Sequence, residues 1–305
     1  MKENDEDICP PLLKPWISIY ENVPPIIKFP LTNISITFTM LSSIYFLAVK
    51  KFIRQCIIPS HFPNNEDTNN INIYLTSISH STVLCVPLFF LLTTQKFVPS
   101  APMNKAPKWW QTSANAVLEF CCGYMLYDGL YNSVYEKYIP GVGFDIPIQD
   151  WCFLGHHLAT TFYMTSTRIN GAGHLSAMII MFFGEITNPV QNSRSAIKVA
   201  LAMGDCCSTP FMSENLYPIV DFLYALMYSI VRVGLNPYLN IRITYDFLCT
   251  KGGRERMALP LSLSLLFMLW GVTLGTIPWC LESVDIVKTY LMHFGSGLNK
   301  SVQDL

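Results

Sequence analysis

The sequence predicts an all-α membrane protein, a polytopic helical bundle of about seven transmembrane helices. Hydrophobic residues make up 51% of the 305 residues and charged residues only 13%, whereas soluble domains carry about 25% charged residues. Apolar runs of roughly 20 residues recur along the chain, and a helix of that length crosses a hydrocarbon core of about 30 Å. Helices also satisfy their own backbone hydrogen bonds in lipid, which favours this class over other membrane folds.

Seven apolar runs give the predicted crossings, and six or eight stay compatible because the fourth and fifth runs are short or polar. They are residues 31–49, 71–95, 113–135, 151–167, 172–191, 216–239 and 257–281. Residues 1–30 are polar and rich in proline, so we expect a tail before an anchoring helix at 31–49. Six further helices form a domain over 71–281. Residues 282–305 are expected to form an interfacial helix and tail, because apolar side chains recur on one helical face.

Charge and cysteine usage exclude several classes of function. The net charge of −1 leaves no basic field for nucleic acid, so no nucleic-acid partner is predicted. The ten cysteines are scattered without any C-x-x-C pair, so no metal site is predicted. Lysines and arginines divide 11 to 8 between the two sides of a seven-span chain, a margin too small for the positive-inside rule to choose an orientation. Nothing in the sequence decides the oligomeric state.

The second and third runs carry polar groups at membrane depth. His80 lies among hydroxyls, either as a structural group bonded to a neighbouring helix or as part of a polar cavity. Tyr124 and Asp128 are four residues apart and share a helix face. A carboxylate in mid-span costs about 2.5 to 3.5 kcal/mol on insertion scales, so we expect Asp128 to point inward at a partner. Glu119 lies nearer the start of its run and is expected to reach the headgroups.

Two adjacent histidines, His156 and His157, lie inside the fourth run. Consecutive helical residues diverge by about 100°, so one imidazole can face a cavity while the other binds an adjacent helix. Burial favours the neutral imidazole, which can accept a proton as a general base. Both histidines are therefore candidate catalytic residues.

The fifth and sixth runs add a carboxylate and a guanidinium. Glu185, Asn188 and Asn192 form a polar stripe on an otherwise apolar helix, and Glu185 is the third candidate catalytic residue. Burial keeps Glu185 protonated unless an imidazole or Arg232 lies near it. Arg232 needs a counter-charge, with Asp128 and Glu185 the available choices. The candidates for a polar cavity or lipid-binding site are His80, Tyr124, Asp128, Asn188, Asn192 and Arg232.

The order and spacing of these groups resemble the TLC domain family, which includes the ceramide synthases, the translocating-chain-associating membrane protein and the ceroid-lipofuscinosis membrane protein. The resemblance covers about Ile71 to Leu281 and rests on Ser77-x-x-His80, Tyr124-x-x-x-Asp128, Asp150 before His156-His157, Glu185-x-x-x-Pro189-x-x-Asn192-x-Arg194, and Arg232 with Pro237. It implies residence in the endoplasmic reticulum and a role in lipid homeostasis.

The form of one motif separates this chain from part of that family. Ceramide synthases are expected to carry a second His-Asp after the paired histidines, whereas this chain has Glu185-Ile-Thr-Asn188-Pro189 in that region. The chain therefore resembles the smaller TLC domain-containing proteins, whose roles concern membrane lipid composition and, in some members, acyl transfer or cargo handling.

Two functions stay open at this point, both with membrane lipids as partners. In the first, a histidine deprotonates an amine or hydroxyl that attacks a thioester or ester, with acyl-CoA or a phospholipid as acyl donor and no bound cofactor. In the second, the protein is a non-catalytic lipid-binding, regulatory or cargo-handling protein, and its intramembrane polar residues are structural. Metal-dependent lipid oxidation is disfavoured because it needs clustered histidines of the H-x-x-H-H kind.

Overall fold

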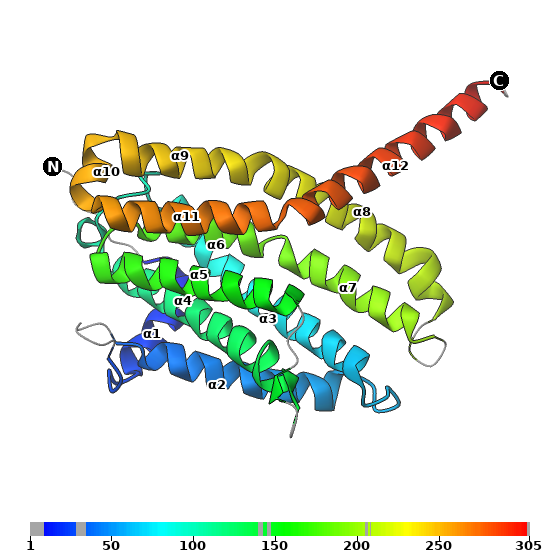
Figure 1. Cartoon of the computed structure of the whole chain (residues 1–305), viewed down its shortest axis with the longest axis horizontal. Coiled ribbons are helices and arrows are strands. Elements are labelled where there is room, and N and C mark those ends of the chain that lie inside the picture. The colour runs from blue at the N-terminus through cyan, green and yellow to red at the C-terminus, as the bar shows by residue number, and fades with distance from the viewer. Residues whose placement is uncertain are drawn as a thin grey trace.

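The computed structural model describes residues 9–28, 35–139, 143–144, 148–204, 207 and 209–303, and they form an all-α bundle (Figure 1). The acidic start of the predicted tail, the first residues of the predicted anchoring helix and the side chain of Asp150 lie outside the described part. The helices are α1 Lys14–Asn22, α2 Thr37–Phe52, α3 Glu66–Thr93, α4 Lys108–Leu126, α5 Ile148–Asn170, α6 His174–Glu185, α7 Asn188–Ala202, α8 Tyr217–Tyr228, α9 Asn236–Cys249, α10 Lys251–Arg256, α11 Leu259–Gly275 and α12 Ile277–Gln303.

Short elements extend or join these helices. The 3₁₀ turns are η1 Pro11–Leu13, η3 Met103–Lys105 and η5 Tyr135–Lys137, and the π-helical turns are η2 Ile53–Ile57, η4 Tyr127–Asn132, η6 Met212–Leu216 and η7 Ser229–Leu235. A two-residue antiparallel pair, β1 Tyr138–Ile139 with β2 Gly143–Phe144, lies in the loop before α5. Every predicted apolar run overlaps a helix or a pair of helices in this set.

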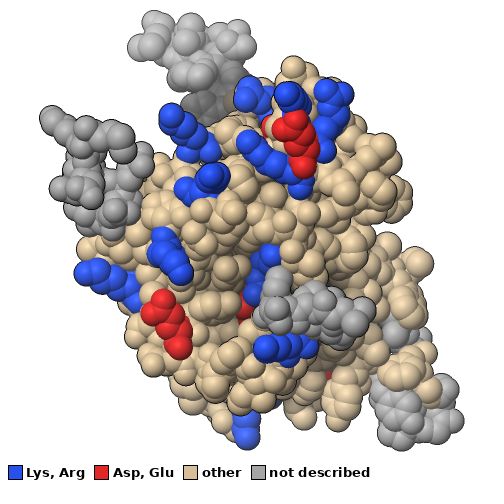
Figure 2. All heavy atoms as spheres, turned by 90° about the vertical axis from the view of Figure 1, so that its left-hand side faces the viewer, with Lys and Arg blue, Asp and Glu red and all other residues tan. Residues whose placement is uncertain are grey.

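The long helices alternate in direction. The helices α2, α4, α6 with α7, and α11 run one way, and α3, α5 and α8 with α9 run back (Figure 1). One end of the bundle therefore collects α1, α10 and the start of α11. Lysine and arginine side chains are spread over that end and acidic side chains are sparse there (Figure 2).

Two described helices are long and apolar enough to cross a membrane, namely α3 and the continuous helix Met212–Cys249. The pair Leu259–Gly275 and Ile277–Met292, bent by 40°, makes a third if it is counted as one broken span. The membrane class is therefore confirmed, while the number of seven crossings stays a prediction. The predicted seventh run is bent at its end because Pro278, in the first turn of α12, has no N–H to continue the helical ladder.

The predicted fifth crossing is two helices rather than one. The break between α6 and α7 falls just before Pro189, which lies in the first turn of α7. Proline is tolerated there because the first N–H groups of a helix lack intrahelical partners, but it cannot donate to the carbonyl of Glu185 in a continuous helix. The break leaves carbonyl groups at the end of α6 available to other side chains.

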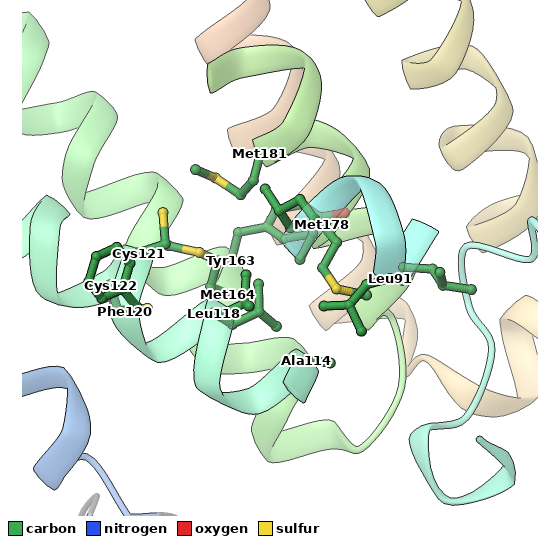
Figure 3. Close-up of a cluster of buried hydrophobic side chains, with 14 of the residues drawn as sticks. Leu91, Ala114, Leu118, Phe120, Cys121, Cys122, Tyr163, Met164, Met178 and Met181 are labelled. Carbon is green, nitrogen blue, oxygen red and sulfur yellow. The ribbon is translucent and has the colours of Figure 1, made fainter. Parts of the chain in front are cut away.

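The apolar core lies between α3, α4, α5 and α6. Met178 and Met181 of α6 lie above Leu118 of α4 and Met164 of α5 (Figure 3). All four side chains are at most 5% exposed. Methionine and leucine side chains of this kind fill irregular space between helices without leaving polar atoms unpaired. This core holds α4 at the centre of the bundle.

The helix α2 packs closely on α4 because Gly123 has no side chain. A β-carbon at Gly123 would lie 2.4 Å from Cβ of Ser42 and 2.6 Å from the carbonyl oxygen of Thr39. The Ser43 hydroxyl donates to the Gly123 carbonyl at 2.8 Å. A small residue that allows such close backbone approach is a common device of helix packing in membranes.

Glu119 does not reach the headgroups as the sequence analysis expected. It is 0% exposed and forms an ion pair with Arg168 of α5. The carboxylate also accepts hydrogen bonds from the Tyr20 hydroxyl of α1 at 2.7 Å and from the backbone N–H of Thr39 in α2 at 3.2 Å. The physical reason is desolvation, since a buried carboxylate requires a cation and donors around it. Glu119 thus joins α1, α2 and α5 to α4.

We predict that Glu119→Gln destabilises the folded chain by about 3 to 5 kcal/mol, because it leaves the Arg168 guanidinium buried without its counter-charge. The measurement is unfolding of the purified protein by a denaturing detergent, followed by circular dichroism. Glu255→Gln is the matched control, because Glu255 is exposed and its pair with Lys251 spans 3.8 Å. Equal stability of the two variants would contradict the prediction.

Candidate functional site

His157 and Asp128 form a pair between α5 and η4. Nε2 of His157 lies 3.5 Å from Oδ2 of Asp128, and the histidine is 7% exposed. Asp128 also accepts from the Asn132 amide at 2.5 Å and from the Tyr124 hydroxyl at 3.4 Å. The expectation that Asp128 points inward at a partner is confirmed. Because a carboxylate attracts a proton donor, this geometry assigns the ring hydrogen to Nε2 and leaves Nδ1 as the acceptor.

Nδ1 of His157 is buried and has no hydrogen-bond partner among the described residues. It faces Gly129, where an added β-carbon would lie 3.4 Å from that nitrogen. Glycine therefore allows η4 to pack closely against the His157 ring without placing a side chain on Nδ1. Buried polar atoms without partners are uncommon in folded proteins, and one beside a carboxylate–imidazole pair indicates a place for a polar group of a ligand.

His80 connects the two halves of the polar interior. Its ring stacks on Tyr124 with centroids 3.8 Å apart and an interplanar angle of 9°. Phe46 of α2 meets the same imidazole edge-on at 5.5 Å. Nδ1 of His80 lies 3.4 Å from Oε2 of Glu185, and Nε2 has no hydrogen-bond partner in the part of the chain that the structure describes. The prediction that an imidazole approaches Glu185 is therefore met by His80.

Glu185 is 4% exposed at the end of α6 and collects donors from two other helices. The Ser81 hydroxyl of α3 donates to Oε2 at 2.5 Å, and the Asn188 amide of α7 donates to the same oxygen at 2.9 Å. One helical turn further along, Asn192 donates to the Ser77 hydroxyl at 2.8 Å. The predicted polar stripe of α6 and α7 thus faces α3.

Arg232 does not pair with Asp128 or Glu185, which were its expected counter-charges. Its Nη2 donates to the Gly184 carbonyl at 2.6 Å and its Nε donates to the Thr187 hydroxyl at 3.3 Å. Among the described residues, no carboxylate lies within ion-pair distance of it. The break after α6 supplies the reason, because a helix carboxyl terminus carries partial negative charge and unpaired carbonyls that bind a cation.

His156 lies beside the polar interior rather than within its hydrogen bonds. Its ring centroid is 5.5 Å from that of His157, and the side chain is half-buried. The two imidazoles diverge as expected for neighbours on a helix. His157 is the one bonded to another helix, and His156 is the one that is open.

The structure therefore brings most of the predicted residues into one connected set, which we call the polar string. It runs from Glu185 through His80, Tyr124 and Asp128 to His157, with Asn188 and Asn192 on the Glu185 side. Sequence reasoning missed Ser81 and Asn132. Both signals were local, since Ser81 adjoins His80 and Asn132 is four residues after Asp128, which places it on the same helix face.

Two hollows lie away from the paired histidines. An apolar hollow of about 300 Å³ is lined by Phe89, Phe182 and Leu239 among others. A second hollow, of about 360 Å³, is lined in part by Asn104 and Arg256. Neither is lined by His156 or His157. Most of the polar string is buried, with His80, Tyr124, His157 and Glu185 each at most 7% exposed.

The comparison with protein families matches residues 70–284 to the TLC domain. This range contains the whole polar string and covers most of the chain, so the protein belongs to the TLC domain family. A comparison of the full sequence with curated proteins finds no match. The family and the apolar helices together define a membrane protein of a lipid-related class. The helices α1 and α2 precede the matched range.

We predict that Ser81 and Glu185 are energetically coupled by about 1.5 to 3 kcal/mol, the range for a hydrogen bond to a charged group. Ser81→Ala, Glu185→Gln and the double variant form a mutant cycle, measured by detergent unfolding. Ser264→Ala combined with Glu185→Gln is the control, because the Ser264 hydroxyl is exposed and bonds its own helix at Pro260. Additive effects in the first cycle would refute the coupling.

Proposed function

We propose that this protein transfers an acyl group to a membrane lipid, with His157 as the general base and Asp128 as the residue that orients it. The observation that carries the proposal is the pairing of Nε2 with the Asp128 carboxylate while Nδ1 stays buried and unpaired. A carboxylate on one ring nitrogen holds the ring hydrogen there and leaves the other nitrogen as a proton acceptor.

The proposed reaction is a balanced acyl transfer. A lipid hydroxyl or amine attacks the carbonyl carbon of an acyl-CoA or a phospholipid, and Nδ1 of His157 accepts the proton that the nucleophile loses. The new C–O or C–N bond replaces the C–S or C–O bond of the donor. The imidazolium then returns its proton to the leaving thiolate or alkoxide, so no metal or redox partner is required.

Residues in and beside the polar string assist in this proposal. His156, half-buried beside His157, contacts the substrate, and Glu185 supports the site through His80 and Tyr124. Arg232 holds the end of α6 and so positions Glu185. The enclosing helices exclude water, which suppresses hydrolysis of the acyl donor.

Access for substrate depends on the seam between η4 and α5, where Gly129 lies against His157. The family resemblance favours the endoplasmic reticulum as the membrane concerned, and the apolar runs favour seven crossings. Fluorescence microscopy of the tagged full-length chain tests the first of these expectations. Glycosylation-site insertion in the loops tests the second.

We predict that His157→Gln and Asp128→Asn each lower the rate of acyl transfer at least a hundredfold, because general-base catalysis contributes about 10² to 10⁴. Purified protein is supplied with isotopically labelled acyl-CoA or phospholipid and membrane lipids, and acylated products are identified by mass spectrometry. Gly129→Ala should also lower the rate, because its methyl group lies against Nδ1.

His61→Gln is the matched control, since His61 is exposed in the loop before α3. Circular dichroism and detergent unfolding of each variant separate lost activity from lost fold. Unchanged product formation in folded His157→Gln protein would end the acyltransferase proposal.

A second candidate function is non-catalytic lipid binding or regulation, including cargo handling. The apolar hollow between Phe89, Phe182 and Leu239 favours it, because that hollow suits an acyl chain and is remote from the histidines. In this case His157→Gln leaves cellular lipid composition unchanged, and replacement of Phe182 by a larger Trp alters it. Lipidomics of cells that express each variant distinguishes the two functions.

A further inference from the structure

Exposed cations gather at one end of the bundle, which Figure 2 shows face on. We call this surface the basic end. Its exposed members are Lys14, Lys28, Lys96, Lys105, Lys108, Arg242, Lys251, Arg254 and Arg256. They come from α1 and the segment after it, from the loop between α3 and α4 and the first residue of α4, and from α9 and α10, segments far apart in the sequence. The fold therefore brings these cations together into one positive surface, although the net charge of the whole chain is −1.

The two ends differ in how their cations are neutralised. Away from the basic end, Lys50 pairs with Glu136 at 2.6 Å, Arg194 pairs with Asp221 at 2.5 Å, and Lys137 pairs with Glu66 at 3.0 Å. At the basic end, the ion pair among described residues is the exposed contact of Lys251 with Glu255 at 3.8 Å. Most of the basic end thus has no intramolecular counter-charge in the part of the chain that the structure describes.

Apolar and aromatic side chains lie among these cations. Phe97 is 37% exposed, with the Arg242 guanidinium 5.8 Å above its ring, and Val98 beside it is 38% exposed. Trp109 directly follows Lys108 at the start of α4. Aromatic residues mixed with lysine and arginine are typical of the headgroup layer of a membrane. This composition favours a position at the depth of lipid phosphates over one in bulk water.

The basic end is also hollowed. The hollow of about 360 Å³ is lined by Asn104 and Gln111 on one side and by Asn170 and Arg256 on the other. The Asn170 amide donates to the Arg256 carbonyl at 3.1 Å, which holds α10 against the end of α5. The Arg256 guanidinium lies over Gly252, where an added β-carbon would be 3.4 Å away. An arginine and three amide side chains that line one hollow are suited to a phosphate, because a guanidinium binds phosphate oxygens with two parallel hydrogen bonds.

We propose that the basic end binds anionic phospholipids of the surrounding leaflet, and that the hollow beside Arg256 seats the phosphate of one headgroup. The charge, the interfacial aromatic residues and the hollow each favour a lipid headgroup over a soluble partner. Polybasic surfaces at the membrane are attracted to anionic leaflets. This interaction is independent of the acyl-transfer proposal, because none of its residues belongs to the polar string.

The test uses the full-length chain in phospholipid nanodiscs of phosphatidylcholine with a minor share of phosphatidylserine. Retained lipids are counted by native mass spectrometry for the wild type and for the triple variant Lys105→Gln, Lys108→Gln and Arg256→Gln. We expect the preference for phosphatidylserine to fall roughly fivefold or more in the variant, and to weaken in the wild type at high salt.

The matched control is Lys51→Gln, Arg54→Gln and Lys198→Gln, which removes the same charge from the opposite end and should keep the preference. Arg256→Gln alone should reduce it less than the triple variant. An undiminished preference in the basic-end variant, or an equal loss in both triple variants, would overturn the proposal. Displacement of phosphatidylserine by free coenzyme A in the wild type but not in Arg256→Gln would also overturn it, because the hollow would then serve a soluble ligand.

Discussion

The desolvation of charge inside an apolar bundle is the constraint on which this structure depends. The buried Glu119 and Glu185 and the half-buried Asp128 meet it in a related way, each contacting a donor or cation on a helix other than its own. Glu119 fixes α1, α2 and α5 on α4, Asp128 fixes α5 on η4, and Glu185 fixes α3 on α6 and α7. Rotating any of these helices by one residue, about 100°, would strand a carboxylate without partners. The contacts of Asp128 and Glu185 therefore both hold helices together and build the polar string.

Local sequence signals predicted part of this arrangement and could not predict the rest. The apolar runs located the helices, and the cost of a carboxylate at membrane depth indicated that Asp128 and Glu185 turn inward. The partner of Glu119 escaped prediction because Arg168 is 49 residues away in the sequence, beyond the reach of local spacing rules. The main partner of Arg232, the Gly184 carbonyl, was not predicted because it becomes available only where the helix breaks. The prediction considered charged side chains as partners and did not include backbone carbonyls.

Interruptions of regular helix carry several of the polar groups. Asp128 lies in the π-helical turn η4, Arg232 lies in η7, and Glu185 ends α6 just before the break at Pro189. A π-helical turn shifts the hydrogen-bond pattern and re-aims the side chains that follow, and such turns are frequent at functional sites. A bundle that needed these residues only for cohesion could hold them on unbroken helices. Their position at interruptions favours a role that requires particular directions.

The unpaired imidazole nitrogens also favour a functional role for these residues over a purely structural one. Nδ1 of His157 and Nε2 of His80 are buried without partners among the described residues, and each such atom costs about 1 to 3 kcal/mol. A purely structural network gains nothing from leaving them unsatisfied, because a hydroxyl on a neighbouring helix would remove the cost. A bound polar group that donates a hydrogen bond to either nitrogen would remove that cost, so the unpaired nitrogens favour a ligand or substrate beside the polar string.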